Sequence, residues 1–403
     1  MKITKKQGVF ILLSVLIVVI ILILLRIITD SISKKNIVQI KDEPIEVYSK
    51  ARVSDFISIP NGKILDDFEI DTTTLGTNEV SFRYKDSYGK HKSSFKIEIE
   101  DTTKPLIWVS GSYTYTIGSN KNLEDSVLCA DNYDKKPTCW IEGEYDLKTK
   151  GNYSLTYKAK DQNGNLEEIP FTLRVIEKKQ NNNTGSSSSS FVSLEEIKEN
   201  YVTDDVILGI DVSKWQGDID WEEVKNQGIE FAMIRLGTQS GIHKESVLDT
   251  YFQKNIKEAK ESGIKVGVYY YSYATSIEES KEQANWVIKQ LSSYKLDLPV
   301  VFDWECYTYF NSFEISLYDL NEIANAFLKV IEDNGYQPMF YGSKNYLEKI
   351  WTSIDYEIWL AHYTKETTYQ GNYKMWQFTS SGRVPGISTL VDVDILKKIN
   401  IMK

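Results

Sequence analysis

The stretch "PVVFDWECY" (residues 299–307) joins an apolar run to two acids that stand one residue apart. Its opening residues are typical of a buried strand. Asp303 and Glu305 follow, and a buried charge costs free energy unless another group pairs with it or uses it. Because residues i and i+2 of a strand point to the same side, roughly 6.6 Å apart, both carboxylates can face one substrate. The alternative is a strand that runs out into a solvated loop.

Strands and helices alternate around this stretch, from residue 206 onward. Eight runs have strand character: 206–212, 231–236, 265–271, 298–302, 339–341, 358–361, 375–378 and 389–393. Helical spacing of apolar residues lies between the early ones at 221–227, 251–262, 277–291, 317–334 and 344–350. This alternation predicts a parallel sheet, and eight strands predict a barrel. Since no long helix follows residue 350, we expect an α/β fold with an incomplete (β/α) TIM-like barrel.

Acidic residues gather at the ends of these predicted strands. Asp211 ends the first, Asp303 and Glu305 end the fourth, and Asp392 lies in the eighth. Active sites of such barrels lie at the carboxyl ends of the strands, and the first and eighth strands become neighbours when a barrel closes. We therefore expect these four carboxylates to ring one mouth, although each alone also fits a helix cap or a loop.

Aromatic residues are abundant, with 26 Tyr and 9 Trp. Flat rings stack on sugar faces, but they also fill protein cores. Tyr269 and Tyr271 alternate onto one face of the third predicted strand, where both can line a groove. Trp376 is the candidate for a stacking platform. Core filling is the alternative for all three.

These segments resemble glycoside hydrolase family 25, the Chalaropsis-type lysozymes. "GIDVSKWQGDIDW" (209–221) is similar to the opening of the family. Further segments follow in the family's order: "GIEFAMIRLG" (228–237), "GVYYYSYATS" (267–276), "PVVFDWE" (299–305), "IWLAHY" (358–363), "MWQFTSSGRVPGI" (375–387) and "VDVD" (391–394). The resemblance implies hydrolysis of the β-1,4 bond between N-acetylmuramic acid and N-acetylglucosamine in peptidoglycan, with retention of configuration. It carries the family's acidic quartet onto Asp211, Asp303, Glu305 and Asp392.

The carboxylates can be given roles from the chemistry of glycoside hydrolysis. One acid must protonate the leaving oxygen, and one anion must stabilise the oxocarbenium-like charge. We expect Glu305 to be the general acid, while Asp303 stays ionised and either stabilises the transition state or orients the substrate's 2-acetamido group. Asp211 and Asp392 are expected to bind sugar hydroxyls and to tune the pair. No cofactor is expected.

The sequence departs from the commonest family pattern at two positions. Trp304 stands where a smaller aliphatic residue is usual, and Asp394 stands where Asn is frequent. Neither change removes a catalytic group. By strand alternation, Trp304 should point away from the sugar into the layer between barrel and helices.

The amino terminus predicts a membrane anchor. Lys2, Lys5 and Lys6 precede a nearly unbroken apolar run from residue 8 to residue 25, which is long enough to span a bilayer. No small-residue cleavage site follows, so an uncleaved signal-anchor is favoured over a cleaved signal peptide. The lysines predict a cytoplasmic tip. We therefore expect residues 1–36 to be a transmembrane signal-anchor of a single-pass membrane protein whose bulk lies outside, at the cell wall.

Between the anchor and the barrel, short alternating runs predict two small all-β sandwich modules, residues 37–101 and 102–177. "EVSFRYKDSYGK" (79–90) aligns with "YSLTYKAKDQNGN" (153–165) as an internal repeat. The second module resembles bacterial immunoglobulin-like surface modules, which are usually spacers or weak binders.

Cysteine and linker patterns complete the organisation. Cys129 and Cys139 flank a turn, and in an exported chain they either pair or stay free. Cys306 is expected to be a small buried side chain. Residues 178–204 are predicted to be a flexible linker, which leaves 205–403 as the catalytic domain. None of the three His or three Cys falls in a metal-ligand spacing, so no metal site is expected.

The formal net charge of -10 argues against nucleic acid as a partner. The expected partners are peptidoglycan and, through the amino-terminal helix, a membrane; the sequence does not identify any protein partners. Two other functions remain open. One is a non-catalytic wall-binding or adhesive protein, and the other is a glycosidase that acts on another N-acetylglucosamine polymer.

Overall fold

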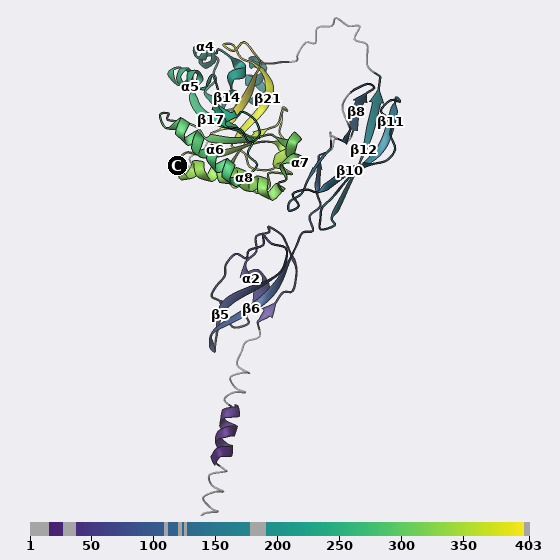
Figure 1. Cartoon of the computed structure of the whole chain (residues 1–403). Coiled ribbons are helices and arrows are strands. Elements are labelled where there is room, and N and C mark those ends of the chain that lie inside the picture. The colour runs from purple at the N-terminus through teal and green to yellow at the C-terminus, as the bar shows by residue number, and fades with distance from the viewer. Residues whose placement is uncertain are drawn as a thin grey trace, which may run out of the picture. The chain divides into compact units, whose positions relative to one another are not determined.

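The computed structural model describes residues 16–26, 38–108, 112–119, 123–124, 127–177 and 191–398 (Figure 1). The chain divides into two compact units, Met1–Thr102 and Thr103–Lys403. Residues 16–26 are helical, and their apolar side chains are exposed. Across the described ranges, no helix combines the length and apolar character needed to cross a membrane. The remaining parts of the predicted anchor, residues 1–15 and 27–36, lie outside the described residues.

The first unit is built on a four-stranded sheet in the order β2-β6-β5-β4. Its strands are β2 (Ile45–Glu46), β4 (Lys63–Ile64), β5 (Gly76–Asp86) and β6 (Gly89–Glu100). The short strands β1 (Gln39–Ile40) and β3 (Ile57–Ser58) pair beside helix α2 (Val53–Phe56). Alternate residues of β5 and β6 are buried, as period-two alternation predicts. The core of this unit includes Val53, Phe82, Tyr84, Phe95 and Ile97.

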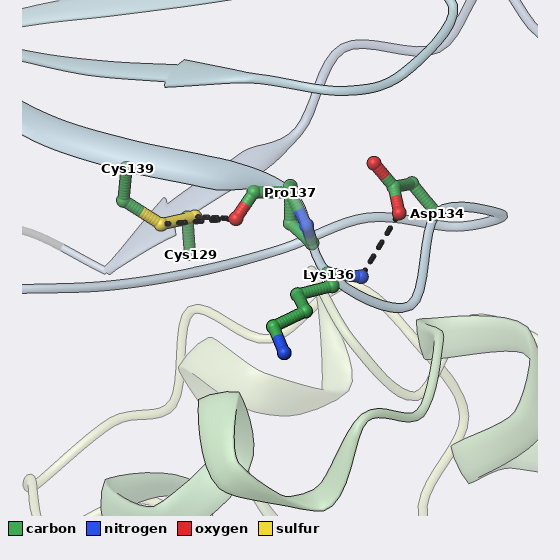
Figure 2. Close-up of a disulfide and its surroundings, with 5 residues drawn as sticks. All are labelled: Cys129, Asp134, Lys136, Pro137 and Cys139. Carbon is green, nitrogen blue, oxygen red and sulfur yellow. Dashed lines mark hydrogen bonds between the residues drawn. A yellow bond between two sulfur atoms is a disulfide. The ribbon is translucent and has the colours of Figure 1, made fainter.

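The second module begins the second unit, with a four-stranded sheet in the order β10-β11-β12-β8 and a separate β7–β9 pair. Its strands are β7 (Leu106–Trp108), β8 (Ser112–Thr116), β9 (Leu128–Ala130), β10 (Thr138–Glu142), β11 (Gly151–Lys160) and β12 (Leu166–Ile176). Cys129 on β9 and Cys139 on β10 form a disulfide, with Cα atoms 6.2 Å apart (Figure 2). The sequence left open whether these two cysteines pair, and in the structure they form a disulfide.

The predicted internal repeat corresponds to two hairpins, β5–β6 and β11–β12. Each turn is closed by an aspartate whose Oδ1 accepts two backbone N–H groups. Asp86 accepts from Tyr88 and Gly89, at 2.8 and 3.1 Å. Asp161 accepts from Gly164 and Asn165, at 2.7 and 2.8 Å. The repeated aspartate is therefore a turn residue in both copies.

The rest of the second unit contains a ten-stranded sheet. Apart from the short β13 (Val192–Ser193) and β16 (Ser246–Leu248), its strands pair in a closed ring. The ring consists of β14 (Val206–Val212), β15 (Phe231–Gln239), β17 (Lys265–Ser272), β18 (Val300–Trp304), β19 (Pro338–Ser343), β20 (Glu357–Ala361), β21 (Met375–Arg383) and β22 (Val391–Lys397). Every strand-like run predicted in this region is a strand.

The last strand of the ring differs from the prediction of a parallel sheet. β22 pairs antiparallel with both of its neighbours, β14 and β21. The connection from β21 to β22, residues 384–390, is too short for a parallel crossover, which needs a dozen or more residues. As a result, β22 brings its first residues to the end of the ring where the other strands finish, and Asp392 comes to the mouth.

Helices pack outside the ring (Figure 1): α4 (Trp221–Asn226), α5 (Phe252–Glu261), α6 (Ile277–Leu291), α8 (Leu317–Asp333) and α9 (Lys344–Leu347). Polar side chains cap several of them; Ser276 and Ser316, for example, accept the backbone N–H three residues on. Within β18, Val301 belongs to the apolar interior of the ring, whereas Val300, Phe302 and Trp304 belong to the layer between the ring and the helices. Asp303 is two residues after Val301 on the same strand, so its side chain also points into the ring.

The folded region begins earlier than predicted. Residues 178–190 of the expected linker lie outside the described residues, but β13 pairs with β21, and helix α3 (Leu194–Tyr201) follows at once. Leu194 and Ile197 are buried against the ring, and Ser193 caps the helix. In the sequence, two apolar residues three positions apart, directly after a Ser that can cap a helix, predict a helix here. Residues 192–201 are therefore part of the barrel region and not of a linker.

Candidate active site

A cavity of ≈ 250 Å³ lies at the mouth of the ring. It is lined by all four of the predicted carboxylates, Asp211, Asp303, Glu305 and Asp392, together with Tyr269 and Tyr271. The strand ends that carry them are adjacent in the ring, since β14 pairs with β22 and β17 pairs with β18. The structure therefore brings these six sequence-predicted residues together at one cavity, and their roles remain predictions.

The pair from the opening stretch sits at the end of β18. Asp303 is 5% exposed, and its Oδ1 has no hydrogen-bond partner among the described residues. Glu305, two residues on, is exposed. The two carboxyl groups lie close enough to shift each other's pKa. Burial first, and then Glu305, raise the pKa of Asp303 well above its usual value.

The surrounding walls of the mouth partly desolvate the Glu305 carboxyl group and raise its pKa, whereas its interaction with Asp303 lowers it. Burial therefore disfavours the charged form of the deeper Asp303. This differs from the expectation that Asp303 is the ionised member of the pair in the free protein, because its depth in the ring was not visible in the sequence.

Asp211 and Asp392 are directly opposite each other on β14 and β22. The amide Nε2 of Gln377 donates to Asp211 Oδ2 at 2.7 Å. Burial, followed by Asp392 and Asp394, raises the pKa of Asp211 well above its usual value. Burial raises the pKa of Asp392 to about 6. Neighbouring carboxylates thus disfavour each other's charge.

Asp394 lies beneath this pair and is fully buried. Its Oδ1 accepts a hydrogen bond from Trp359 Nε1 at 2.8 Å, and its carboxyl group raises the pKa of Asp211. Burial raises the pKa of Asp394 well above its usual value. The residue that departs from the common family pattern therefore takes part in the carboxyl network of the site.

Gln377 is a functional residue that sequence reasoning missed. Its Oε1 accepts from the hydroxyl groups of Tyr341 and Tyr363, each at 2.9 Å. Two donors on the oxygen turn the amide nitrogen toward Asp211. The sequence contained a signal for the inward direction of Gln377. Met375 faces the ring interior, and Gln377, two residues further along β21, faces the same way.

Arg235 was missed in the same way. It follows the inward residues Phe231 and Met233 at spacings of two along β15. Its guanidinium group contacts Asp249 Oδ2 through Nε at 2.8 Å and Nη2 at 2.6 Å. Its positive charge at the mouth lowers the pKa of Asp303, against the larger effect of burial.

The prediction for Trp376 is wrong. It is 6% exposed, its Nε1 donates to the His362 carbonyl oxygen at 2.9 Å, and its ring packs against Phe378 and Tyr201. It faces outward because its neighbours Met375 and Gln377 face inward.

Trp215, which was not predicted, is 70% exposed and lines the mouth. It is the better candidate for stacking on a sugar.

Trp304 lies where strand alternation placed it. Its side chain is fully buried outside the ring, and its Nε1 donates to the Ala274 carbonyl oxygen at 3.0 Å. Its ring contacts those of Tyr307, Phe310, Phe313 and Trp351. It does not reach the cavity between Asp303 and Glu305.

Carboxylates that offer oxygens to a cation also occur away from the mouth. Asp131 and Asp161, in the second module, bring carboxylate oxygens within 4.8 Å of one another. Asp161 Oδ1 already accepts two turn N–H groups, and burial raises the pKa of Asp131. We assign no metal to these two residues, and the absence of a metal centre remains a prediction.

Known proteins with similar sequences or structures match the carboxyl-terminal part of the chain. A solved family 25 glycosyl hydrolase from Bacillus anthracis is 25% identical, with a TM-score of 0.41, over 49% of this chain and 92% of that chain. The uncharacterized protein YegX of Escherichia coli K12 is 28% identical over 197 residues, 47% of this chain and 69% of YegX. An autolytic lysozyme of Clostridium acetobutylicum is 25% identical over 189 residues, 46% of this chain and 54% of that protein. Residues 210–387 match the family model of glycosyl hydrolases family 25. By this match the chain carries a glycosyl hydrolase family 25 domain, and it is a glycoside hydrolase.

Proposed function

We propose that the chain is a lysozyme that hydrolyses the β-1,4 bond between N-acetylmuramic acid and N-acetylglucosamine in peptidoglycan. The observation that carries this proposal is the Asp303–Glu305 pair, which lines one cavity at the mouth of the ring together with Asp211 and Asp392. Two such carboxyl groups, one protonated and one ionised, supply both the acid and the anion that glycoside hydrolysis requires. The lysozyme among the relatives supports the choice of bond.

The depths of the two carboxyl groups suggest how the proton is used. Glu305 is exposed at the rim, where a leaving oxygen can reach it, whereas Asp303 is buried beneath the sugar position. Positive charge that develops on the sugar stabilises the Asp303 anion. The proton then passes from Asp303 to Glu305, and from Glu305 to the leaving oxygen. The environments of the two groups keep their pKa values apart.

The closeness of the carboxyl groups also supports retention of configuration. Inverting enzymes hold their carboxyl groups about 6.5–9.5 Å apart, so that a water molecule fits between them and the sugar. Asp303 and Glu305 are only two residues apart and shift each other's pKa, which favours the shorter separation of about 5–5.5 Å that retaining enzymes use. Asp303 is then either the nucleophile or the group that orients the 2-acetamido oxygen for attack.

The other mouth residues are proposed to bind the glycan. Asp211 and Asp392 offer acceptors to sugar hydroxyl groups, Gln377 orients Asp211, and Trp215 provides an exposed ring for stacking. We interpret the closed ring as the incomplete TIM-like barrel of the sequence prediction, and the two β modules as immunoglobulin-like.

We also propose that the chain is held at a membrane with its bulk at the cell wall. The support is in the sequence, where Lys2, Lys5 and Lys6 precede the apolar run of residues 8–25. Membrane fractionation of the full chain, compared with a chain that lacks residues 1–36, tests this placement. An unchanged soluble fraction would contradict it.

The products of wall digestion test the proposed bond. We expect the full chain to release fragments that end in reducing N-acetylmuramic acid, which borohydride converts to muramitol. Reduced glucosamine ends instead would show cleavage of the other wall glycosidic bond. If chitin is cut and walls are not, the substrate is another polymer. If neither is cut, the domain binds without catalysis.

Replacement of the buried Asp394 should change the pH dependence of stability. Its pKa is raised in the folded state, so the folded chain binds this proton more tightly than the unfolded chain, whose pKa is about 3.9. Wild-type stability therefore falls as pH rises above about 4, by up to about 1.4 kcal/mol per pH unit until the folded pKa is reached. Asp394→Asn keeps an oxygen for Trp359 Nε1 and removes this loss.

Thermal unfolding between about pH 4 and pH 8 measures the effect. The stability of Asp394→Asn relative to the wild type should increase with pH. Asp355→Asn, at an exposed position, is the matched control and should show no such trend. A constant difference across this pH range would contradict ionisation-linked destabilisation by Asp394.

A further inference from the structure

The second module contacts the start of helix α8. The first N–H groups of a helix lack partners within the helix. In α8, the Leu317 N–H donates to the Asp131 carbonyl oxygen at 2.7 Å, and the Tyr318 N–H donates to the Asn132 carbonyl oxygen at 3.3 Å. Both acceptors belong to the turn that follows β9 of the module. The module therefore supplies part of the cap of this helix.

Two ion pairs flank these hydrogen bonds. Lys136 Nζ lies 2.7 Å from Glu314 Oε1, and Lys135 Nζ lies 3.0 Å from Asp319 Oδ2. Figure 2 shows Lys136 on the far side of Pro137 from the disulfide, with its backbone N–H held by Asp134. Exposed ion pairs add little stability, but they select one orientation of the two surfaces.

An apolar contact lies beside the polar ones. The ring of Trp108, on β7, is 5.6 Å from that of Phe310, which begins the short helix α7 (Phe310–Phe313). Phe310 is 3% exposed. Ala130 of the module is fully buried and belongs to the same apolar cluster as the layer outside the ring. Residues 103–403 accordingly form one compact unit.

The contact leads directly to the catalytic pair. Phe310 packs on Trp304, with ring centroids 6.4 Å apart. Trp304 is the residue between Asp303 and Glu305, and its indole nitrogen is fixed by Ala274. Close-packed interiors transmit displacements with little loss. A shift of Phe310 should therefore reach the peptide that carries Glu305.

We propose that the docked second module positions Glu305 through Trp108, Phe310 and Trp304, so that the module is a working part of the catalytic unit. This goes beyond the role of spacer expected from the sequence. The inference rests on the proposed function, because it concerns the acid of that reaction. Trp108, Phe310 and Trp304 are positioning residues that do not touch the substrate.

Trp108→Ala in the full chain tests the proposal. Hydrogen exchange at the Leu317 and Tyr318 amides measures docking, and exchange in the β11–β12 hairpin shows whether the module stays folded. We expect faster exchange at the two amides, an unchanged hairpin, and a decrease in kcat on the order of tenfold to a hundredfold, because small displacements of a catalytic group have such effects. KM should change little, since the mouth residues that bind sugar are untouched. Trp108→Phe should restore kcat.

A charge reversal provides a second variant that leaves the apolar contact in place. Lys136→Glu brings like charges together with Glu314 and should lower kcat in the same way, to a smaller extent. Adding Glu314→Lys should reverse the loss. Lys150→Glu is the matched control, because Lys150 pairs with Glu177 within the module.

The outcomes separate this inference from the proposed function. Free exchange of the Leu317 and Tyr318 amides in the wild type would overturn the docking itself. An unchanged kcat in Trp108→Ala, with the amides either exposed or still protected, would overturn the positioning role. A wild type that releases no wall fragments would refute the proposed function, whereas the exchange measurement would still report on docking.

Discussion

Glu305→Gln should abolish the release of fragments from purified cell walls, with a decrease in kcat of about 10²–10⁴-fold. Gln has nearly the shape of Glu but carries no transferable proton, so the leaving sugar oxygen would depart without protonation. Glu305 is exposed and lies beyond the end of β18. The substitution should therefore leave the thermal unfolding temperature and the sedimentation of the protein with walls unchanged.

An activated substrate identifies the acid more sharply than loss of activity alone. A nitrophenyl glycoside of the wall disaccharide has a leaving group that needs no protonation, so Glu305→Gln should keep far more of its activity on it than on walls. Glu366→Gln is the matched control, at an exposed position in the loop after β20, and should behave as the wild type. Equal losses on both substrates would assign Glu305 another role.

The site was predictable where its residues follow from strand alternation. The acids of β18, the two tyrosines of β17 and the outward direction of Trp304 all depend on a period of two within one strand. The same rule, applied to β21, excludes Trp376 and selects Gln377. An abundance of aromatic residues does not show which of them face the ring interior, whereas strand direction does.

Other features depend on segments that are far apart in the sequence. Gln377 donates to Asp211 across 166 residues, and Lys136 reaches Glu314 across 178 residues. No local period encodes such contacts. The antiparallel direction of β22 also concerns distant strands, but it could have been predicted locally. The 384–390 connection is visible in the sequence, and it is too short for a parallel crossover.

The ionisation of the Asp303–Glu305 pair could not be read from the sequence. Asp303 and Glu305 differ in depth, and depth sets the cost of ionisation in each group. Spacing of i and i+2 showed only that both carboxylates face the same side. Burial therefore raises the pKa of Asp303 well above its usual value, although the exposed Glu305 is the one placed to deliver the proton.

Asp303→Asn should lower kcat about 10²–10⁴-fold on walls and equally on the nitrophenyl glycoside. Both substrates pass through an oxocarbenium-like transition state, and both require the anion beneath the sugar. The variant should also be at least as stable as the wild type at neutral pH. Because burial raises the pKa of Asp303, the folded wild type loses stability as pH rises above the unfolded value, and Asn removes this loss.

The comparison of the two variants decides the roles of the pair. If Glu305→Gln recovers on the activated substrate and Asp303→Asn does not, the exposed residue is the acid and the buried residue is the anion. If Asp303→Asn recovers and Glu305→Gln does not, the roles are reversed. Asp303, whose charged form burial disfavours, would then donate the proton, and Glu305 would be the anion. Thermal unfolding of both variants shows whether either loss comes from the fold. A fully active Asp303→Asn would leave the buried carboxyl with no part in the chemistry, and its cost to stability unexplained.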